Sequence, residues 1–134
     1  MICPNRHQKR RGVVLVECSI IYIVVFLLIL GAISIGFGIF RYQQLAWLAG
    51  EGARWASVHG PKYQSEQNAA APTSQDVITN VIKPNLLLLN LNDLTCTLSM
   101  TSGVATVTLS YTWTPEVFLS PVTFKSKSVF PITY

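Results

Sequence analysis

The chain has 134 residues, enough for one domain. Half of the residues are hydrophobic and 12% are charged, whereas about 25% of an ordinary soluble domain is charged, so the composition is typical of a membrane protein. The net charge is +4, but four of the basic residues, Arg6, Lys9, Arg10 and Arg11, precede Gly12. The remaining basic and acidic residues balance, so no basic surface is left for nucleic acid, and we exclude that partner.

The N-terminal third predicts a single membrane span. Residues 1–12 form a short basic segment that we expect to be a disordered, cytoplasmic leader. Residues 18–40 follow without a charge, and about 20 apolar residues suffice to cross a bilayer as a helix. Only Arg41 closely follows this run, so the positive-inside rule places the N-terminus in the cytoplasm and the residues after Arg41 outside.

We expect the helix to continue beyond the membrane as a stalk, over residues 13–60 in all. Residues 41–58 contain no proline, and His59-Gly60-Pro61 would end the helix, with Gly60 as a left-handed cap. A helix over residues 13–58 would be roughly 70 Å long and would protrude from the bilayer. Small residues recur at three- and four-residue spacings: Ala32, Ser34, Gly36, Gly38, Ala46, Ala49, Gly50, Ala53 and Ser57.

These small residues predict close helix packing. In the stalk they favour packing on the chain's own domain or on a neighbour over ligand binding. In the span, the pairs Ala32/Gly36 and Ser34/Gly38 could admit another transmembrane helix, but glycine is common in such helices anyway, and both interpretations stay open.

Residues 61–134 predict an extracytoplasmic α+β domain. Residues 63–73 are polar and alanine-rich, as in a surface linker. Thr73 or Ser74 could cap a short amphipathic helix that ends at Lys83-Pro84. Its apolar residues are Val77, Ile78, Val81 and Ile82. Residues 86–91 are apolar and could form either a strand or a buried loop.

The C-terminal part predicts about three antiparallel strands. Apolar and threonine-rich positions alternate from Thr95 to Trp113, around a turn at Thr101-Ser102-Gly103. Residues 122–129 resemble a third strand, with Lys125 and Lys127 on a solvated edge. We expect the short helix and the end of the stalk to cover the apolar face. Tyr111 and Trp113 would lie in this core, or else on an exposed adhesive face. The predicted fold class is an α+β membrane protein with a long N-terminal helix and a small antiparallel sheet.

The strongest functional signal lies where the basic leader meets the span. Glu17 follows Gly12 and four apolar residues, and a carboxylate within a membrane segment costs up to about 2.5–3.5 kcal/mol. A cut after Gly12 would give Val13 a new ammonium group and place Glu17 roughly one helical turn away, about 6 Å along the axis. In a filament, Glu17 of one subunit could then pair with the Val13 ammonium of its neighbour.

This segment resembles the processing site of type IV prepilins, and more narrowly the TadE-like family of pseudopilins. The resemblance is carried by Arg11-Gly12-Val13-Val14-Leu15-Val16-Glu17, the apolar run, Tyr42-Gln43-Gln44-Leu45 and Glu51-Gly52-Ala53-Arg54-Trp55-Ala56. It covers residues 10–58 well and residues 95–134 loosely. Cys18 departs from the pattern, because an aromatic residue is more usual after the acid.

The resemblance implies a minor subunit of a tight-adherence (Flp-type) pilus or related secretion system in an inner membrane. It implies cleavage by a prepilin peptidase, with Gly12 before the scissile bond, Val13 as the mature N-terminus and Glu17 as the conserved acid. The implied partners are the lipid bilayer, that peptidase, other pilin subunits and the pilus assembly platform. The family's main pilin is far shorter, so the chain fits a minor subunit.

Other interpretations remain. Gly12 and Glu17 could occur by chance in a simple signal anchor, and the protein would then be an uncleaved, membrane-anchored binding or adhesion module. Val16-Glu17 before Cys18 lacks the small residues of a lipoprotein site.

No enzyme, cofactor, metal or small-molecule substrate is predicted. The cysteines, Cys3, Cys18 and Cys96, fall in three different environments, so neither an internal disulfide nor a metal site is expected. The histidines, His7 and His59, are isolated, and no two of Asp76, Asp93 and Glu116 pair for acid–base work.

Overall fold

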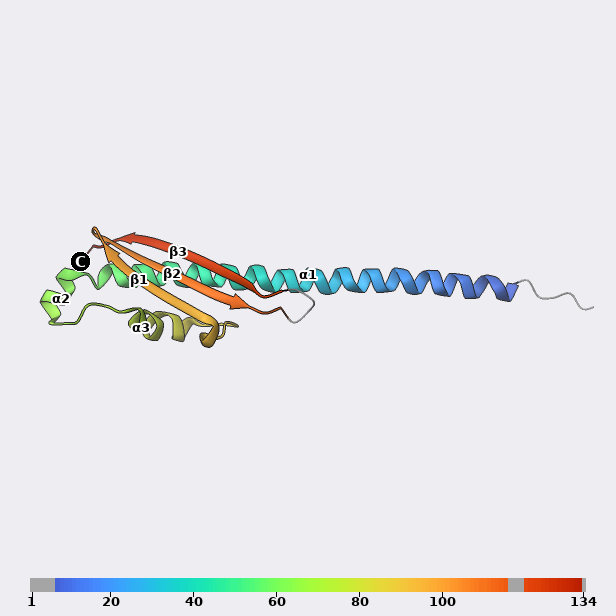
Figure 1. The fold of residues 1–134 in the computed structure, drawn as a ribbon, viewed down its shortest axis with the longest axis horizontal. Helices are drawn as coiled ribbons and strands as arrows, with labels where there is room; N and C mark the ends of the chain where they lie inside the picture. The colour runs from blue at the N-terminus through green and yellow to red at the C-terminus, as the bar shows by residue number, and fades with distance from the viewer. Residues whose placement is uncertain (1–6, 116–119, 134) are drawn as a thin grey trace, which may run out of the picture. The chain divides into compact units, whose positions relative to one another are not determined.

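The computed structural model describes residues 7–115 and 120–133, which form two compact units divided between Gly36 and Phe37. Helix α1, His7–Val58, begins in the first unit and ends in the second (Figure 1). It starts at His7, within the segment expected to be a disordered leader. Lysine, arginine and glutamine favour helices and no proline separates His7 from Val13, so the helix extends upstream. The rest of the expected leader lies outside the described residues.

In the first unit, the described residues all belong to α1. An 18-residue window of this helix has a mean hydropathy of 3.0, and none of it is buried. Among the described residues α1 is the helix that is long and apolar enough to cross a membrane. A helix that is hydrophobic on all sides needs an apolar environment around it. The predicted fold class, an α+β chain with a long apolar N-terminal helix, is confirmed.

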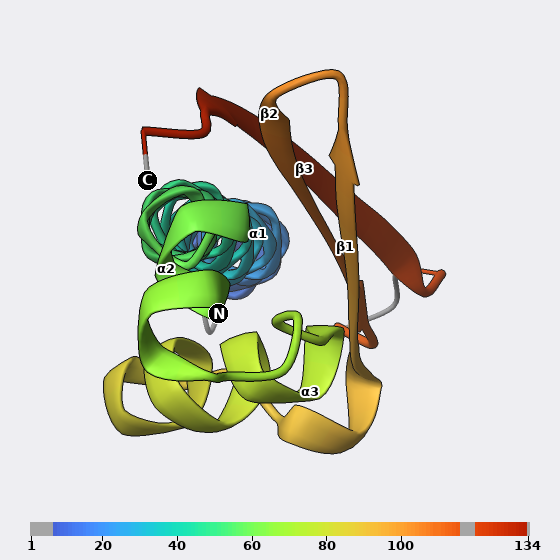
Figure 2. The ribbon, with the colours of Figure 1, turned by 90° about the vertical axis from the view of Figure 1, so that its left-hand side faces the viewer.

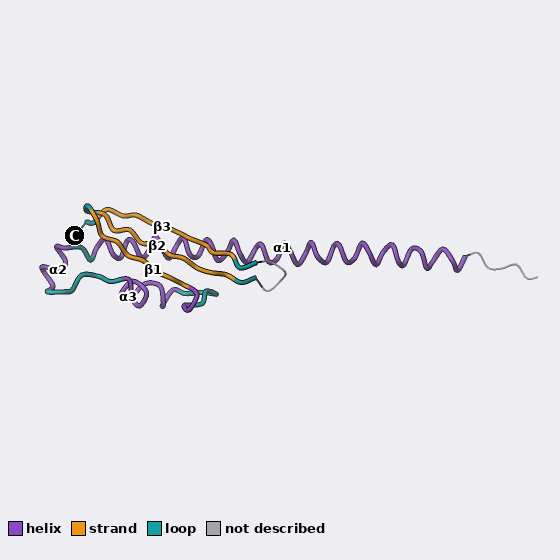
Figure 3. The backbone as a smooth tube through the Cα atoms, in the orientation of Figure 1, coloured by secondary structure: helices purple, strands orange, loops and turns teal. Residues whose placement is uncertain are grey.

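The second unit contains an antiparallel sheet in the order β1-β2-β3, formed by Leu94–Thr101, Val104–Trp113 and Val122–Pro131 (Figures 1 and 3). Strands β1 and β2 form the predicted hairpin. Ser102 and Gly103 make its turn with φ values of 56° and 77°, as two-residue hairpin turns that match the strand twist require. The predicted third strand is confirmed and extends to Pro131.

One face of this sheet carries the core. Leu109 and Tyr111 of β2 are buried, whereas the side chains of Lys125 and Lys127 on the edge strand β3 are exposed. The second half of α1 and the short helix α3 lie against the buried face (Figure 2), as the sequence predicted. The buried residues of the core are Leu45, Leu48, Ala49, Ala53, Val77, Ile82, Leu89, Leu94, Val107, Leu109 and Tyr111.

Helix α3, Ser74–Val77, begins with a capping box. Thr73 is the N-cap: its hydroxyl accepts a hydrogen bond from the Asp76 N–H, and the Asp76 carboxylate accepts one from the Thr73 N–H at 2.8 Å. The helix continues through a π turn, Ile78–Ile82, and a 3₁₀ turn, Lys83–Asn85. Ser74 Oγ also accepts a hydrogen bond of 3.0 Å from the Leu98 N–H, so α3 covers part of the outer edge of β1.

Two connections differ from the sequence prediction. The expected linker over residues 63–73 is partly helical, because α2 spans Pro61–Gln67. Pro61 occupies the first turn, where a missing N–H costs nothing. Gly60 is therefore the N-cap of α2 with extended dihedrals (φ −73°, ψ −171°), and the expectation of a left-handed Gly60 cap is wrong.

The open choice for residues 86–91 is also resolved. Residues 86–90 form a loop, and Leu91–Asp93 form a 3₁₀ turn before β1.

Candidate processing and assembly segment

The predicted cleavage site and its acid lie on one face of α1 in the first unit. Gly12, Val13, Val16, Glu17 and Ile20 line a shallow depression along the helix surface. Their spacings of three and four residues place them above one another on the helix. The structure thus brings Val13 and Glu17 to the same face, one turn apart.

The surface around this face is apolar and uncovered. Val13, Val16 and Ile20 are all exposed, and Glu17 is exposed among them. Within the described part of the chain, no ion pair or hydrogen bond to Glu17 is formed. An unpaired carboxylate in an apolar surface is costly in a membrane or a protein interface. The arrangement therefore favours a cationic partner from outside the described chain.

Gly12 lies within α1, and a Cβ at this position would meet no atom of the described side chains within 4 Å. Packing in the chain therefore does not require a glycine here. Glycine in a helix interior is less favourable than alanine by roughly 1 kcal/mol. Gly12 thus weakens the helix beside the predicted scissile bond.

The predicted small-residue positions divide into packed and open ones. Ala49 and Ala53 are fully buried in the core, and a Cβ at Gly38 would lie 2.8 Å from Cζ3 of Trp113. Ala32, Gly36 and Ala46 are exposed, while Ser34 and Gly50 are intermediate, and Gly36 and Gly50 have open space beside them.

The sequence prediction missed part of the packing face of α1. Gly52 is buried, and a Cβ there would lie 3.0 Å from Val77 Cγ1. Leu45 and Leu48 are fully buried beside it. Leu45, Leu48, Gly52 and Ala56 recur at three- and four-residue spacings and so share one helix face. Apolar and small residues on the other faces hide this stripe in the sequence.

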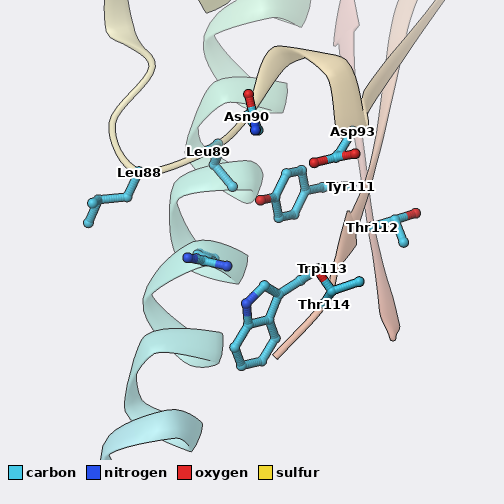
Figure 4. Close-up of a pocket in the computed structure, with 9 residues that line it drawn as sticks. Leu88, Leu89, Asn90, Asp93, Tyr111, Thr112, Trp113 and Thr114 are labelled. Carbon is cyan, nitrogen blue, oxygen red and sulfur yellow. The ribbon is translucent and has the colours of Figure 1, made fainter. Parts of the chain in front are cut away.

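Arg41 lines a cavity of about 300 Å³ in the second unit, together with Asp93, Trp113 and the 88–90 loop (Figure 4). Its Cζ lies 5.2 Å from the centroid of the Trp113 ring, within range of a cation–π contact. The Nε atom of Arg41 is buried and has no hydrogen-bond partner among the described residues. Trp113 is partly buried and stacks on Phe124 with centroids 6.1 Å apart, so it packs at the edge of the core.

The other chemically active side chains have structural roles. Cys18 and Cys96 are free, and burial raises the pKa of the Cys96 thiol to about 11. The His59 ring stacks on Trp55, and its Nδ1 lies 2.8 Å from the Trp55 carbonyl oxygen. Among the described residues, no cluster of three or more His, Cys, Asp or Glu side chains could hold a metal ion. Cys3 and Glu116 lie outside the described residues.

These features define an α+β protein with a small antiparallel sheet and an N-terminal helix suited to a single membrane span. The family model described as TadE-like protein matches residues 12–54, about a third of the chain. The resemblance drawn from the sequence is thus confirmed: over this segment the chain is similar to TadE-like proteins. No curated protein and no solved structure matches the chain significantly.

Proposed function

We propose that the chain is a membrane-anchored minor subunit of a Tad (Flp-type) pilus or a related secretion system. The observation that carries this proposal is the TadE-like segment, residues 12–54. It encloses the predicted cleavage site, the acid and the whole uncharged run. The exposed apolar surface of α1 supports it, because that surface needs lipid or neighbouring subunits around it.

The proposed topology is an N-terminus in the cytoplasm and the sheet outside an inner membrane. Four positive charges precede Gly12, whereas only Arg41 closely follows the apolar run. Positive charges in short segments beside a span stay on the cytoplasmic side. The second unit would then lie in the periplasm or on the cell surface.

Cleavage after Gly12 by a prepilin peptidase would prepare the chain for assembly. It removes the basic leader, which cannot enter an apolar filament core, and it creates an ammonium group on Val13. Glu17 of one subunit then pairs with Val13 of the next. Loss of one partner of a buried pair costs about 3–5 kcal/mol, so this pair would fix the register between neighbouring helices.

Processing can be tested with two leucine substitutions in cells that express the peptidase. Gly12→Leu should block cleavage, because it places a bulky side chain beside the scissile bond. Gly36→Leu is the matched control: it also lies in α1, and it has open space beside it. Mass spectrometry should find chains that begin at Val13 for the wild type and the control. Recovery of the wild-type chain with Met1 intact would contradict processing and favour an uncleaved binding or adhesion module.

The assembly step can be tested separately with Glu17→Ala. We expect normal membrane insertion but reduced incorporation into pili, measured by immunoblotting of sheared pilus fractions. Glu51→Ala is the control, because Glu51 lies on the same helix but only approaches Arg54 at 3.9 Å on an exposed surface, where an ion pair contributes little. Equal incorporation of both variants would argue against the pairing of Glu17 with Val13.

A further inference from the structure

An exposed apolar patch lies in the second unit, beside the residues where the uncharged run ends. It consists of Phe40 and Trp47 on α1 and Leu87 and Leu88 on the following loop; all four are exposed, the two leucines by 66% and 65%. Phe40, Trp47 and Leu87 line one apolar groove of about 370 Å³ together with Gln44 and Pro84. The loop therefore lies against the same stretch of helix. Leu88 follows Leu87 in this loop and lines the neighbouring Arg41 cavity instead of the groove.

The backbone of the loop directs Leu88 outward. Leu88 has a φ of 59°, a left-handed conformation that costs a leucine roughly 1–2 kcal/mol. This conformation lets the chain reverse, so that Leu89 enters the core with 7% exposure while Leu88 points away from α1 (Figure 4). Asparagine or glycine would adopt this backbone more easily. A leucine here thus places apolar surface in solvent at a conformational cost.

The position of the patch along α1 matches a membrane surface. Phe40 is the last residue of the uncharged run, and Arg41 follows it directly. The run of residues 18–40 is about 34 Å long as a helix, close to the ~30 Å hydrocarbon core. Trp47 lies about 9 Å beyond Arg41. A tryptophan at this height is typical of the interfacial region of a bilayer.

We propose that the patch of Phe40, Trp47, Leu87 and Leu88 docks into the headgroup region of the bilayer that α1 crosses. This inference rests on the membrane insertion in the proposed function. It adds a second, peripheral membrane contact that holds the extracytoplasmic unit against the lipid before assembly.

The charged and polar groups around the patch favour lipid as its occupant. Arg41 and the exposed Lys83 flank it and can meet lipid phosphates, while Asp93 lines the cavity on the Arg41 side. Gln44 faces the groove and is nine-tenths buried, and its Oε1 has no hydrogen-bond partner among the described residues.

Fluorescence quenching by labelled lipids tests this contact. The three native cysteines of the full chain are replaced, and three variants are made from it, each with one new cysteine in place of Leu88, Ser102 or Ser34. An environment-sensitive fluorophore is attached to that cysteine. Each form is reconstituted in phosphatidylethanolamine–phosphatidylglycerol vesicles that contain a lipid with a nitroxide near its headgroup. Ser102 is the distal control, because its turn lies near the far end of α1. The neighbouring Gly103 carbonyl accepts a hydrogen bond from the Ile132 N–H, and the next residue, Thr133, donates its N–H to the carbonyl of Ser57. Ser57 lies sixteen residues beyond Arg41 on α1.

We expect the label at Leu88 to lose about half of its fluorescence, as a side chain at headgroup depth should, while the label at Ser102 keeps its signal. Equal signals at Leu88 and Ser102 would overturn the proposal. A second outcome would also overturn it: emission from the label at Leu88 that changes with the protein-to-lipid ratio but not with the nitroxide lipid. A second copy of the chain would then occupy the patch. The label at Ser34 reports insertion itself, because its emission should shift to shorter wavelength in the hydrocarbon core; if it emits as it does in water, the proposed membrane span fails as well.

A second variant separates the docking from folding. Leu88→Asn removes the apolar side chain but suits the left-handed backbone, so the sheet should melt at or above the wild-type temperature. With the fluorophore at Leu87, this substitution should reduce quenching by the nitroxide lipid. Unchanged quenching would show that the apolar side chain of Leu88 does not drive the contact.

Discussion

Gly52 lies at the centre of the contact between α1, α3 and β2, and its replacement by alanine tests how tightly these elements pack. The added Cβ would lie 3.0 Å from Val77 Cγ1 and 3.5 Å from Val107 Cγ1. Carbon atoms in ordinary contact are about 3.5 Å or more apart, so the Val77 methyl would have to move by a few tenths of an ångström. Both valines are fully buried and, being β-branched, rotate poorly about χ1. The strain must therefore pass to the backbone.

The expected free energy combines two opposing effects. Overpacking of a core costs about 1–3 kcal/mol, whereas replacing glycine by alanine in a helix stabilises it by about 1 kcal/mol. Gly52→Ala should therefore lower the free energy of unfolding by up to about 2 kcal/mol. Gly50→Ala is the matched control, because it lies in the same helix with no atom within 4 Å of its Cβ. Gly50→Ala should therefore raise the free energy of unfolding by about 1 kcal/mol, the helix stabilisation alone.

Thermal unfolding of the full chain in detergent micelles, followed by near-ultraviolet circular dichroism, measures this difference. The two variants should differ by about 1–3 kcal/mol, which corresponds to roughly 4 °C or more in Tm for a unit of this size. If Gly52→Ala melts as high as Gly50→Ala, the three elements pack more loosely than the structure indicates, and the reasoning is refuted.

Three further predictions concern the second unit. Thr73→Ala removes the N-cap of α3 and should cost about 1 kcal/mol of stability in thermal unfolding, whereas Thr73→Ser should retain most of it. Hydrogen bonds from the Thr73 side chain and N–H lower the pKa of Asp76 below its usual 3.8. The stabilisation that the Asp76 carboxylate gives the fold is therefore complete above pH 3.8 and is lost as the pH falls through the lower pKa of the folded state. The Tm difference between wild type and Asp76→Asn should persist at pH 6 and vanish in strong acid. In a chain with no other cysteine, Cys96 should react slowly with maleimide at pH 8. The rise of its pKa from 9.0 to about 11 leaves about a hundredfold less thiolate. An equal reaction rate in the urea-unfolded chain would count against this effect of burial.

The strands and the candidate processing segment were accessible from the sequence because their signals are local. Alternation of apolar and threonine residues identifies a strand with one buried face, and Gly103 marks the turn that joins β1 to β2. Gly12 stands out because an apolar stretch follows it, and Glu17 stands out because it interrupts that stretch. The structure adds that Val13 and Glu17 share a helix face.

The packing face of α1 was less accessible, because it depends on what lies opposite. Residues 41–58 are mostly apolar or small on several sides, so periodicity alone does not select one stripe. Contacts with Val107 and Val77 select Leu48 and Gly52 for the core and leave Ala46 exposed. The outward position of Leu88 was hidden for a similar reason, since a run of leucines gives no sign of where its backbone turns.

The two edges of the sheet bear on how copies of this chain can combine. On β1, the Leu98 N–H is already bound by Ser74, and on β3 Lys125 and Lys127 are exposed while Pro131 offers no N–H. Edges of this kind discourage a neighbouring chain from adding a strand. Polymerisation through β-strand exchange, and the amyloid-like fibres that can follow from it, are thereby disfavoured.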